Sequence, residues 1–157
     1  MKKLATMLIV SLLFAFQAFS AEDKIELSSG QTVYAAIYSY VFTGPKERLF
    51  NLSAMLSIRN TDLHNQIPVL SVEYYDNNGQ SIKEYVQKPL NLAPLASHQF
   101  SIKESDAIGG FGANFIVKWK ANKEINPPII ESVMIGTKSG QGISFVSQGK
   151  VISENTK

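Results

Sequence analysis

Residues 103–115 combine carboxylates, an amide and several glycines, which are residue types found in cation-binding loops. Glu104, Asp106 and Asn114 would supply hard oxygen ligands of the kind that calcium takes. The segment lacks the spacing of an EF-hand loop, and two acids are few for a tight calcium site. The alternative is a long connection between strands, in which glycines permit the turns and Ser and Asp cap them. We therefore expect no cofactor, with calcium as the ion to test.

A second glycine-rich segment, residues 136–142, includes Ser139, Gly140, Gln141 and Gly142. It contains Lys and Ser, but their order does not match a phosphate-binding loop. The segment is either a hairpin turn or a recognition loop at one end of a β-sandwich, where such folds often bind.

Tyr34, Tyr38 and Tyr40 lie on one face of a segment whose other face is aliphatic. If the aliphatic face is buried, the tyrosines form an exposed platform that could stack on sugars or anchor a protein, because Tyr offers apolar area with a polar tip. Otherwise both faces are covered, as in a strand that passes between two sheets. The candidate contact residues are these three tyrosines and residues 139–142.

The sequence has few combinations of residues that are typical of an enzyme active site. The chain has no cysteine, which excludes thiol nucleophiles, zinc ribbons, iron–sulfur clusters and disulfides. A hydrolase could be built only on His64 or His98 with Asp62 or Asp106, and no Gly-x-Ser-x-Gly elbow occurs. We predict that the protein is not an enzyme and that both histidines are exposed polar residues.

The first residues predict an export signal rather than a part of the fold. Two lysines precede an apolar stretch over residues 4–16, and small residues follow at the positions that a signal peptidase reads. The stretch is shorter than the ~20 residues of a bilayer span, and no cysteine is present for a lipoprotein anchor. We predict a helical Sec-type signal peptide over residues 1–20, cleaved after Ser20 or Ala21. The protein would then be periplasmic or secreted, without a stable membrane span.

The charge balance argues against nucleic-acid binding. The chain has 15 Lys and Arg against 13 Asp and Glu, a net charge of +2, and the two signal lysines account for that excess. Residues 21–157 are therefore neutral, which leaves no electrostatic grip on a phosphate backbone. With 45% hydrophobic and 18% charged residues, the composition is that of a globular domain.

The rest of the chain has the pattern of strands and turns. Residues 50–59 alternate between apolar and mostly polar side chains with a period of two. The turn at residues 77–79 predicts a hairpin in which Tyr74 faces Ile82 and Glu73 faces Lys83. In residues 67–75, Leu70 is expected inward, and Trp119 is expected at the centre of the core.

These signals predict an all-β fold in a single domain over residues 21–157. Strands are expected over residues 32–43, 50–59, 67–75, the partner strand after residue 79, 97–103, 115–120, 129–136 and 143–152. Seven to eight short strands without helical periodicity favour an antiparallel immunoglobulin-like β-sandwich. A small β-barrel is the alternative.

Several short motifs carry a resemblance between this chain and a known protein family. They begin with Gly30-Gln31-Thr32-Val33-Tyr34 and end with Ser139-Gly140-Gln141-Gly142-Ile143-Ser144-Phe145; between them lie Arg59-Asn60-Thr61, Tyr74-Tyr75-Asp76, Lys103-Glu104-Ser105-Asp106, Gly112-Ala113-Asn114-Phe115 and Asn126-Pro127-Pro128. The chain resembles a family of exported bacterial proteins known only as a domain of unknown function. The resemblance implies export and a compact β domain, and it implies no catalytic residue, ligand or partner.

The resulting functional hypothesis is a non-catalytic periplasmic or secreted β-sandwich that binds a protein or envelope component. A carbohydrate- or cation-binding module is the alternative, and a hydrolase is the remote one. The sequence leaves the partner and the oligomeric state open.

Overall fold

The computed structural model describes residues 26–138 and 140–154, which form twelve strands and no helix. The predicted signal peptide with its cleavage site, and Ser139, lie outside the described residues. The strands are β1 Ser28–Ala36, β2 Tyr40–Thr43, β3 Arg48–Asn51, β4 Ser53–Arg59, β5 Ile67–Tyr75, β6 Ser81–Glu84, β7 Leu90–Leu92, β8 Ser97–Ile102, β9 Asn114–Ile125, β10 Ile129–Lys138, β11 Gln141–Gln148 and β12 Lys150–Glu154.

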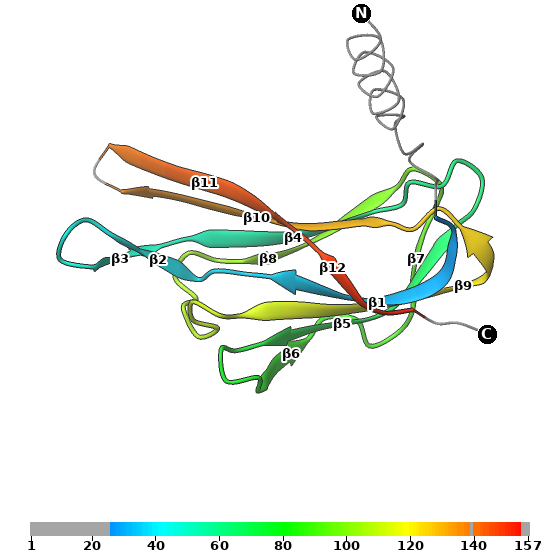
Figure 1. Ribbon diagram of the computed structural model, residues 1–157, viewed down its shortest axis with the longest axis horizontal. Coiled ribbons are helices and arrows are strands. Elements are labelled where there is room, and N and C mark those ends of the chain that lie inside the picture. The colour runs from blue at the N-terminus through cyan, green and yellow to red at the C-terminus, as the bar shows by residue number, and fades with distance from the viewer. Residues whose placement is uncertain (1–25, 139, 155–157) are drawn as a thin grey trace, which may run out of the picture.

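Two antiparallel sheets face each other, and a two-stranded hairpin extends from them (Figure 1). The first sheet has the order β12-β1-β9-β5-β6, with β7 also paired to β5. The second sheet has the order β11-β10-β4-β8, and the small hairpin is β2–β3. The sheets do not close into a barrel, so the predicted β-sandwich is confirmed and the barrel alternative is wrong. In Figure 1 the hairpins β2–β3 and β10–β11 project toward the same end of the molecule.

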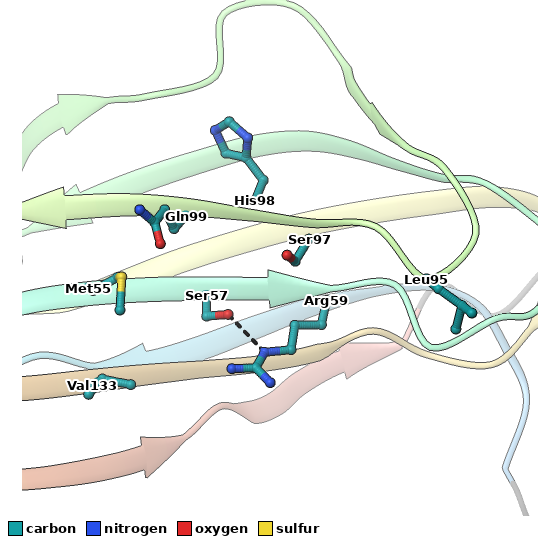
Figure 2. A pocket seen from close by; sticks show the side chains of 8 residues that line it. All are labelled: Met55, Ser57, Arg59, Leu95, Ser97, His98, Gln99 and Val133. Atoms are coloured by element: carbon teal, nitrogen blue, oxygen red, sulfur yellow. Dashed lines mark hydrogen bonds between the residues drawn. The ribbon is translucent and has the colours of Figure 1, made fainter.

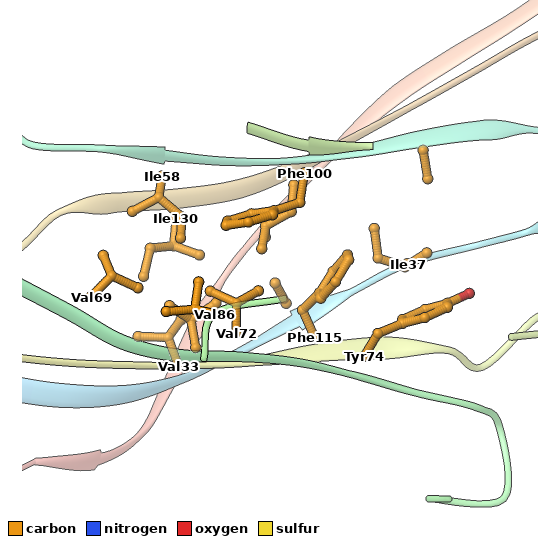
Figure 3. Close-up of a cluster of buried hydrophobic side chains, with 14 of the residues drawn as sticks. Val33, Ile37, Ile58, Val69, Val72, Tyr74, Val86, Phe100, Phe115 and Ile130 are labelled. Atoms are coloured by element: carbon orange, nitrogen blue, oxygen red, sulfur yellow. The ribbon is translucent and has the colours of Figure 1, made fainter. Parts of the chain in front are cut away.

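The core lies between the two sheets and follows the alternation of the sequence (Figure 3). On β4 the inward residues Ala54, Leu56 and Ile58 are buried, as the period of two predicts. Trp119 is fully buried at the predicted central position. Its indole Nε1 donates to Oε1 of Gln31 at 3.3 Å, which satisfies the polar atom of an otherwise apolar side chain.

Twelve strands arise where eight were expected because three predicted strands are interrupted and a short one is added. A bend at Ser39 separates β1 from β2, and Leu52 separates β3 from β4. Gly149 separates β11 from β12. A Cβ at Gly149 would lie 2.7 Å from the carbonyl oxygen of Ile130, so glycine allows the chain to cross there from the second sheet to the first.

The C-terminal strand β12 pairs with the N-terminal strand β1. β12 pairs antiparallel with β1, in a register that places Gln31 opposite Glu154. The Glu154 carboxylate accepts hydrogen bonds from Gln31 Nε2 at 2.6 Å and from Ser28 Oγ at 2.8 Å. Gln31 thus connects the buried Trp119 to the C-terminal strand, so β12 is held by side chains as well as by its ladder.

Two β-bulges shift side chains from their expected positions. The predicted loop at residues 77–79 is present, with the Asp76 amide donating to Gln80 O at 2.9 Å. An irregularity between Tyr74 and Tyr75 then places Lys83 rather than Ile82 opposite Tyr74, so the predicted register of this hairpin is wrong by one residue from Tyr74 back to Glu73. On β5 a second shift after Val69 turns Leu70 outward with 41% exposure, against the expected inward position.

Asn60 closes the end of the sandwich at which β4 terminates. Its side-chain Nδ2 donates to the carbonyl oxygens of Asn65 at 2.8 Å, Leu92 at 3.0 Å and Ala93 at 2.9 Å. Its Oδ1 accepts the amide of Asp62 at 2.9 Å, and the whole residue is buried. One amide therefore fixes two turns that are about 30 residues apart in sequence.

In the described residues, no helix has the length and apolar character needed to cross a membrane.

Candidate functional site

A row of aromatic rings lies at the end of the molecule to which the two hairpins project. Tyr38 contacts Phe111 and Phe145 with ring centroids 5.1 and 5.5 Å apart, both edge-to-face. Phe42 lies 6.5 Å from Phe111 and 5.6 Å from Tyr40. We call these five residues the aromatic end. Edge-to-face packing stabilises such pairs beyond their buried area.

The backbone positions these rings from three parts of the chain. Tyr38 lies between β1 and β2, where the Ile37 amide donates to Ala113 O at 2.9 Å and the Ser39 amide donates to Gly110 O at 3.1 Å. These bonds hold residues 37–39 beside the glycine-rich loop that carries Phe111. Phe145 comes from β11, so the aromatic end joins a sheet, a loop and a hairpin.

Two rings of the aromatic end are unusually exposed. Phe42 is 53% exposed and Phe111 is 49% exposed, while Tyr38 and Phe145 below them are half-buried against the core. Further exposed apolar side chains, Leu49 and Ile108, lie on the neighbouring hairpin and loop. Large exposed aromatic side chains that lie together are typical of surfaces that bind a partner.

The structure separates the three predicted tyrosines. Tyr38 and Tyr40 belong to the aromatic end, whereas Tyr34 lies on the outer face of the first sheet, opposite Ile116 and Lys150. The aliphatic residues that alternate with Tyr34 are buried, as the platform hypothesis requires, and Tyr34 itself is half-buried.

The predicted recognition loop is the tip of the β10–β11 hairpin. Gly140, Gln141 and Gly142 are exposed there, and Lys138 pairs with Gln141. Phe145, farther along β11, contacts Tyr38, so this hairpin and the tyrosine segment are joined at the aromatic end.

The residues of the predicted cation site take separate positions. Glu104 is exposed, and Asp106 accepts the Ile108 amide at 3.2 Å within its own loop. Asn114 belongs to β9, where it pairs with Tyr75 and Ala36. Within residues 26–138 and 140–154, no three His, Cys, Asp or Glu side chains form a group that could hold a metal ion.

The glycines of this loop have a packing role. Gly109 lies against Tyr74, and a Cβ there would be 2.7 Å from Tyr74 Cζ and 2.8 Å from Ala113 Cβ. Tyr74 is buried, which raises the pKa of its hydroxyl, and the hydroxyl lies 3.5 Å from Ser39 Oγ. The loop therefore seals the core at this end, in agreement with its interpretation as a connection.

The hydrolase residues are engaged in turn structure. His64 and His98 are exposed, and the ring of His98 packs edge-to-face on Phe100. Asp62 is buried, and its carboxylate accepts the backbone amides of His64 at 2.8 Å, Asn65 at 2.7 Å and Asn126 at 3.2 Å. These hydrogen bonds, that from His64 foremost, outweigh burial and lower the pKa of Asp62 to about 2.

The pKa of Asp62 predicts a loss of stability in acid. Because the folded carboxyl has a pKa of about 2 against 3.8 in the unfolded chain, its contribution is complete above pH ~4 and fades between pH 4 and 2. D62N should therefore unfold at lower urea concentration than the wild type at pH 7, and the difference should shrink as the pH falls to 2. Urea midpoints at several pH values measure this difference.

D76N provides the comparison for that experiment. The pKa of Asp76 is also lowered, chiefly by the hydrogen bond from the Gln80 amide. The loss of wild-type stability with falling pH therefore includes both carboxylates, and D76N gives the part that belongs to Asp76. Equal destabilisation by D62N at pH 7 and pH 2 would contradict the role assigned to the Asp62 carboxylate.

A hollow of about 530 Å³ lies on the outer face of the second sheet (Figure 2). Arg59 crosses it, with Nε donating to Ser57 Oγ at 3.1 Å and Nη2 at 3.1 Å from Oε1 of Glu131. The charge of Arg59 is thus paired with Glu131, which weakens the hollow as an anion site. The aromatic end has the stronger features of a binding surface. The residues that line the hollow are Met55, Ser57, Arg59, Leu95, Ser97, His98, Gln99 and Val133.

Sequence reasoning missed part of the aromatic end. Phe42 continues the alternation of Tyr38 and Tyr40 and could have been included from its spacing. Phe111 lies in the glycine-rich loop, which was interpreted from its acidic residues as a possible cation site. No periodic pattern in the sequence links Phe111 to Tyr38. Their contact depends on the pairing of residues 37–39 with residues 110–113.

Comparisons with known proteins give a family without an assigned activity. The family model described as "Protein of unknown function (DUF3124)" matches residues 30–152. No curated protein matches the chain. A solved structure described as "Crystal Structure of Thermotoga maritima 1070" is similar with 9% identity and a TM-score of 0.47, over 76% of this chain and 92% of that chain.

Proposed function

The chain belongs to the family described as Protein of unknown function (DUF3124), and from this premise we propose that it is a non-catalytic binding protein whose contact surface is the aromatic end. The partner is a protein or another envelope component. The matched span includes all the motifs on which the sequence resemblance was based, from Gly30 to Phe145. The proposal includes export by the signal peptide over residues 1–20, a periplasmic or secreted location and an immunoglobulin-like strand arrangement.

The observation that carries this proposal is the pair of half-exposed rings, Phe42 and Phe111. Each ring packs edge-to-face on a tyrosine, Phe111 on Tyr38 and Phe42 on Tyr40, which restricts the orientations that it can take. A fixed ring loses little conformational freedom on binding, which is why aromatic residues dominate interface energetics.

The test is to remove these rings without disturbing the core. In F42S/F111S we expect recovery of the bound envelope component on immobilised protein to fall at least about tenfold, in the range of a binding hot spot. L63S is the control, because Leu63 is 63% exposed and lies between β4 and β5, beyond the end of β4 that is away from the β2–β3 hairpin. Phe42 and Phe111 are each about half exposed and lie outside the buried core, so F42S/F111S should remain folded, with an unfolding midpoint only modestly below that of the wild type.

The carbohydrate- or cation-binding alternative is tested on the same proteins. A ligand that binds only the native state raises the melting temperature. A thermal shift with a glycan panel that disappears in F42S/F111S would assign sugar stacking to the aromatic end. A shift with calcium that disappears in D106N would support the cation module. Equal partner recovery by wild type and F42S/F111S would contradict the proposed surface.

A further inference from the structure

β11 has one paired edge and one open edge. It pairs with β10 over eight positions, from Gln141 opposite Lys138 to Gln148 opposite Glu131. It is the terminal strand of the second sheet, and no other strand in the described part of the chain pairs with it. Figure 1 shows β11 along the border of the molecule, with β10 on its inner side.

The backbone groups that point out of this edge can be identified. In an antiparallel ladder, alternate residues direct both N–H and C=O to the partner strand, and those between direct them away. The Gly149 amide donates to Ile130 O at 2.8 Å, which continues the β10–β11 register. Odd-numbered residues of β11 therefore bond to β10. The residues that direct their N–H and C=O to the open edge are Gly142, Ser144, Val146 and Gln148.

This edge lacks the features that normally prevent pairing with another chain. Edge strands are commonly protected by charged side chains, proline or bulges. β6 carries Lys83 and Glu84, and β12 carries Lys150 and Glu154. β11 has neither a charged residue nor a proline, and its register with β10 is continuous.

The sequence of β11 is also complementary to itself. In an antiparallel pair centred on Phe145, Gly142 lies opposite Gln148 of a second copy, and Ser144 lies opposite Val146. Each bonded pair joins a small residue to a larger one, and no like charges meet. The outward-directed groups of the two strands coincide in this register, so each pair can exchange both hydrogen bonds.

We propose that β11 is a self-association strand, which pairs antiparallel with β11 of a second copy of this chain. The two four-stranded sheets then form one continuous sheet across the dimer. Val146, which is 56% exposed, then lies beside Ser144 of the second copy on the outer face. The contact uses the open backbone edge of β11. Phe145, at the centre of the pair, also belongs to the aromatic end, so the two proposed surfaces adjoin on this strand.

Charge exchange across the pair tests this contact. S144K/V146K places lysine opposite lysine in both central pairs, and S144E/V146E places glutamate opposite glutamate. We expect a concentration-dependent dimer for wild type in sedimentation equilibrium, monomers for each variant alone, and a restored dimer in their equimolar mixture. L70K, on the first sheet, is the control for an added surface charge and should dimerise like wild type.

The register is tested by single cysteines, which is straightforward in a chain without native cysteine. Residue 143 lies opposite residue 147 of the second copy in a non-bonded pair, whose Cα separation suits a disulfide. Mixed I143C and S147C chains should form a heterodimeric disulfide. S147C alone should form none, because its two copies lie roughly 13 Å apart along the strands.

Four results would overturn the proposal, and the first three concern the strand pair directly. They are a wild-type monomer at all concentrations, a dimer that survives in both charge variants alone, and equal disulfide formation by S147C alone. A dimer that is lost in F42S/F111S and retained in S144K/V146K would also overturn it, and would assign self-association to the aromatic end.

Discussion

Replacement of Asn60 by aspartate is expected to lower the free energy of unfolding by about 3–5 kcal/mol, since uncompensated buried polar groups cost ~1–3 kcal/mol each. A carboxylate cannot donate to Asn65 O, Leu92 O and Ala93 O, all of which lie within 3.0 Å of the amide nitrogen. It would also add a negative charge two residues from the carboxylate of Asp62. Urea denaturation at pH 7 measures the loss.

The pH dependence distinguishes this cause from a simple loss of packing. Protonation of the new carboxyl restores one hydrogen-bond donor, so its pKa should be higher in the folded than in the unfolded state. The loss of unfolding free energy in N60D relative to wild type should therefore shrink as the pH falls. N91D is the matched control, because Asn91 is exposed on β7 beside the same turn. N60A gives a second measurement if N60D fails to fold. A loss below 1 kcal/mol in N60A would contradict the role of Asn60 as the connector of these turns.

Replacement of Gly109 by alanine should cost about 2–3 kcal/mol, at the upper end of typical overpacking effects. The added Cβ would lie 2.7 Å from Tyr74 Cζ and 2.8 Å from Ala113 Cβ, and the Tyr74 hydroxyl is the nearest atom. Tyr74 is buried and stacks on Phe115 at 5.1 Å, so it cannot move aside without opening the core. The melting temperature should fall by roughly 6–12 °C.

A double-mutant cycle with Tyr74→Phe identifies the clash. In the wild-type background, removal of the hydroxyl should lower stability. In the Gly109→Ala background it should instead restore part of the lost stability, because it removes the clashing atom, so the two substitutions are not additive. Gly142→Ala is the control, since a Cβ at Gly142 meets nothing within 4 Å. Additive losses in the double variant would show that Tyr74 is not the residue that excludes a side chain at position 109.

Short-range alternation predicted most of the core. The inward residues of 50–59 and the central position of Trp119 are confirmed because the period of two survives in long, regular strands. Leu70 and Ile82 were misplaced for one shared reason. Each lies at a β-bulge, where one extra residue reverses the side-chain direction and no local sequence signal marks it.

The candidate site was less predictable than the core. Tyr38 and Tyr40 were identified from their own spacing, but their neighbours Phe111 and Phe145 are more than 70 residues away in sequence. Such contacts depend on which strands become neighbours, and composition and periodicity do not contain that information. The same limit applies to Asn60, whose turn chemistry is evident but whose three acceptors are not.

The pairing of β1 with β12 sets the order in which the molecule can be completed. During synthesis, β1 is made first and its neighbour on this side last, so this edge stays open until Lys150–Glu154 has emerged. The Ser28–Glu154 hydrogen bond closes a loop of 126 residues, and contacts of such separation form slowly. A chain interrupted before Lys150 would keep the strands of the second sheet and the β1–β9 ladder, yet leave the other edge of β1 without a partner and open to pairing with another chain.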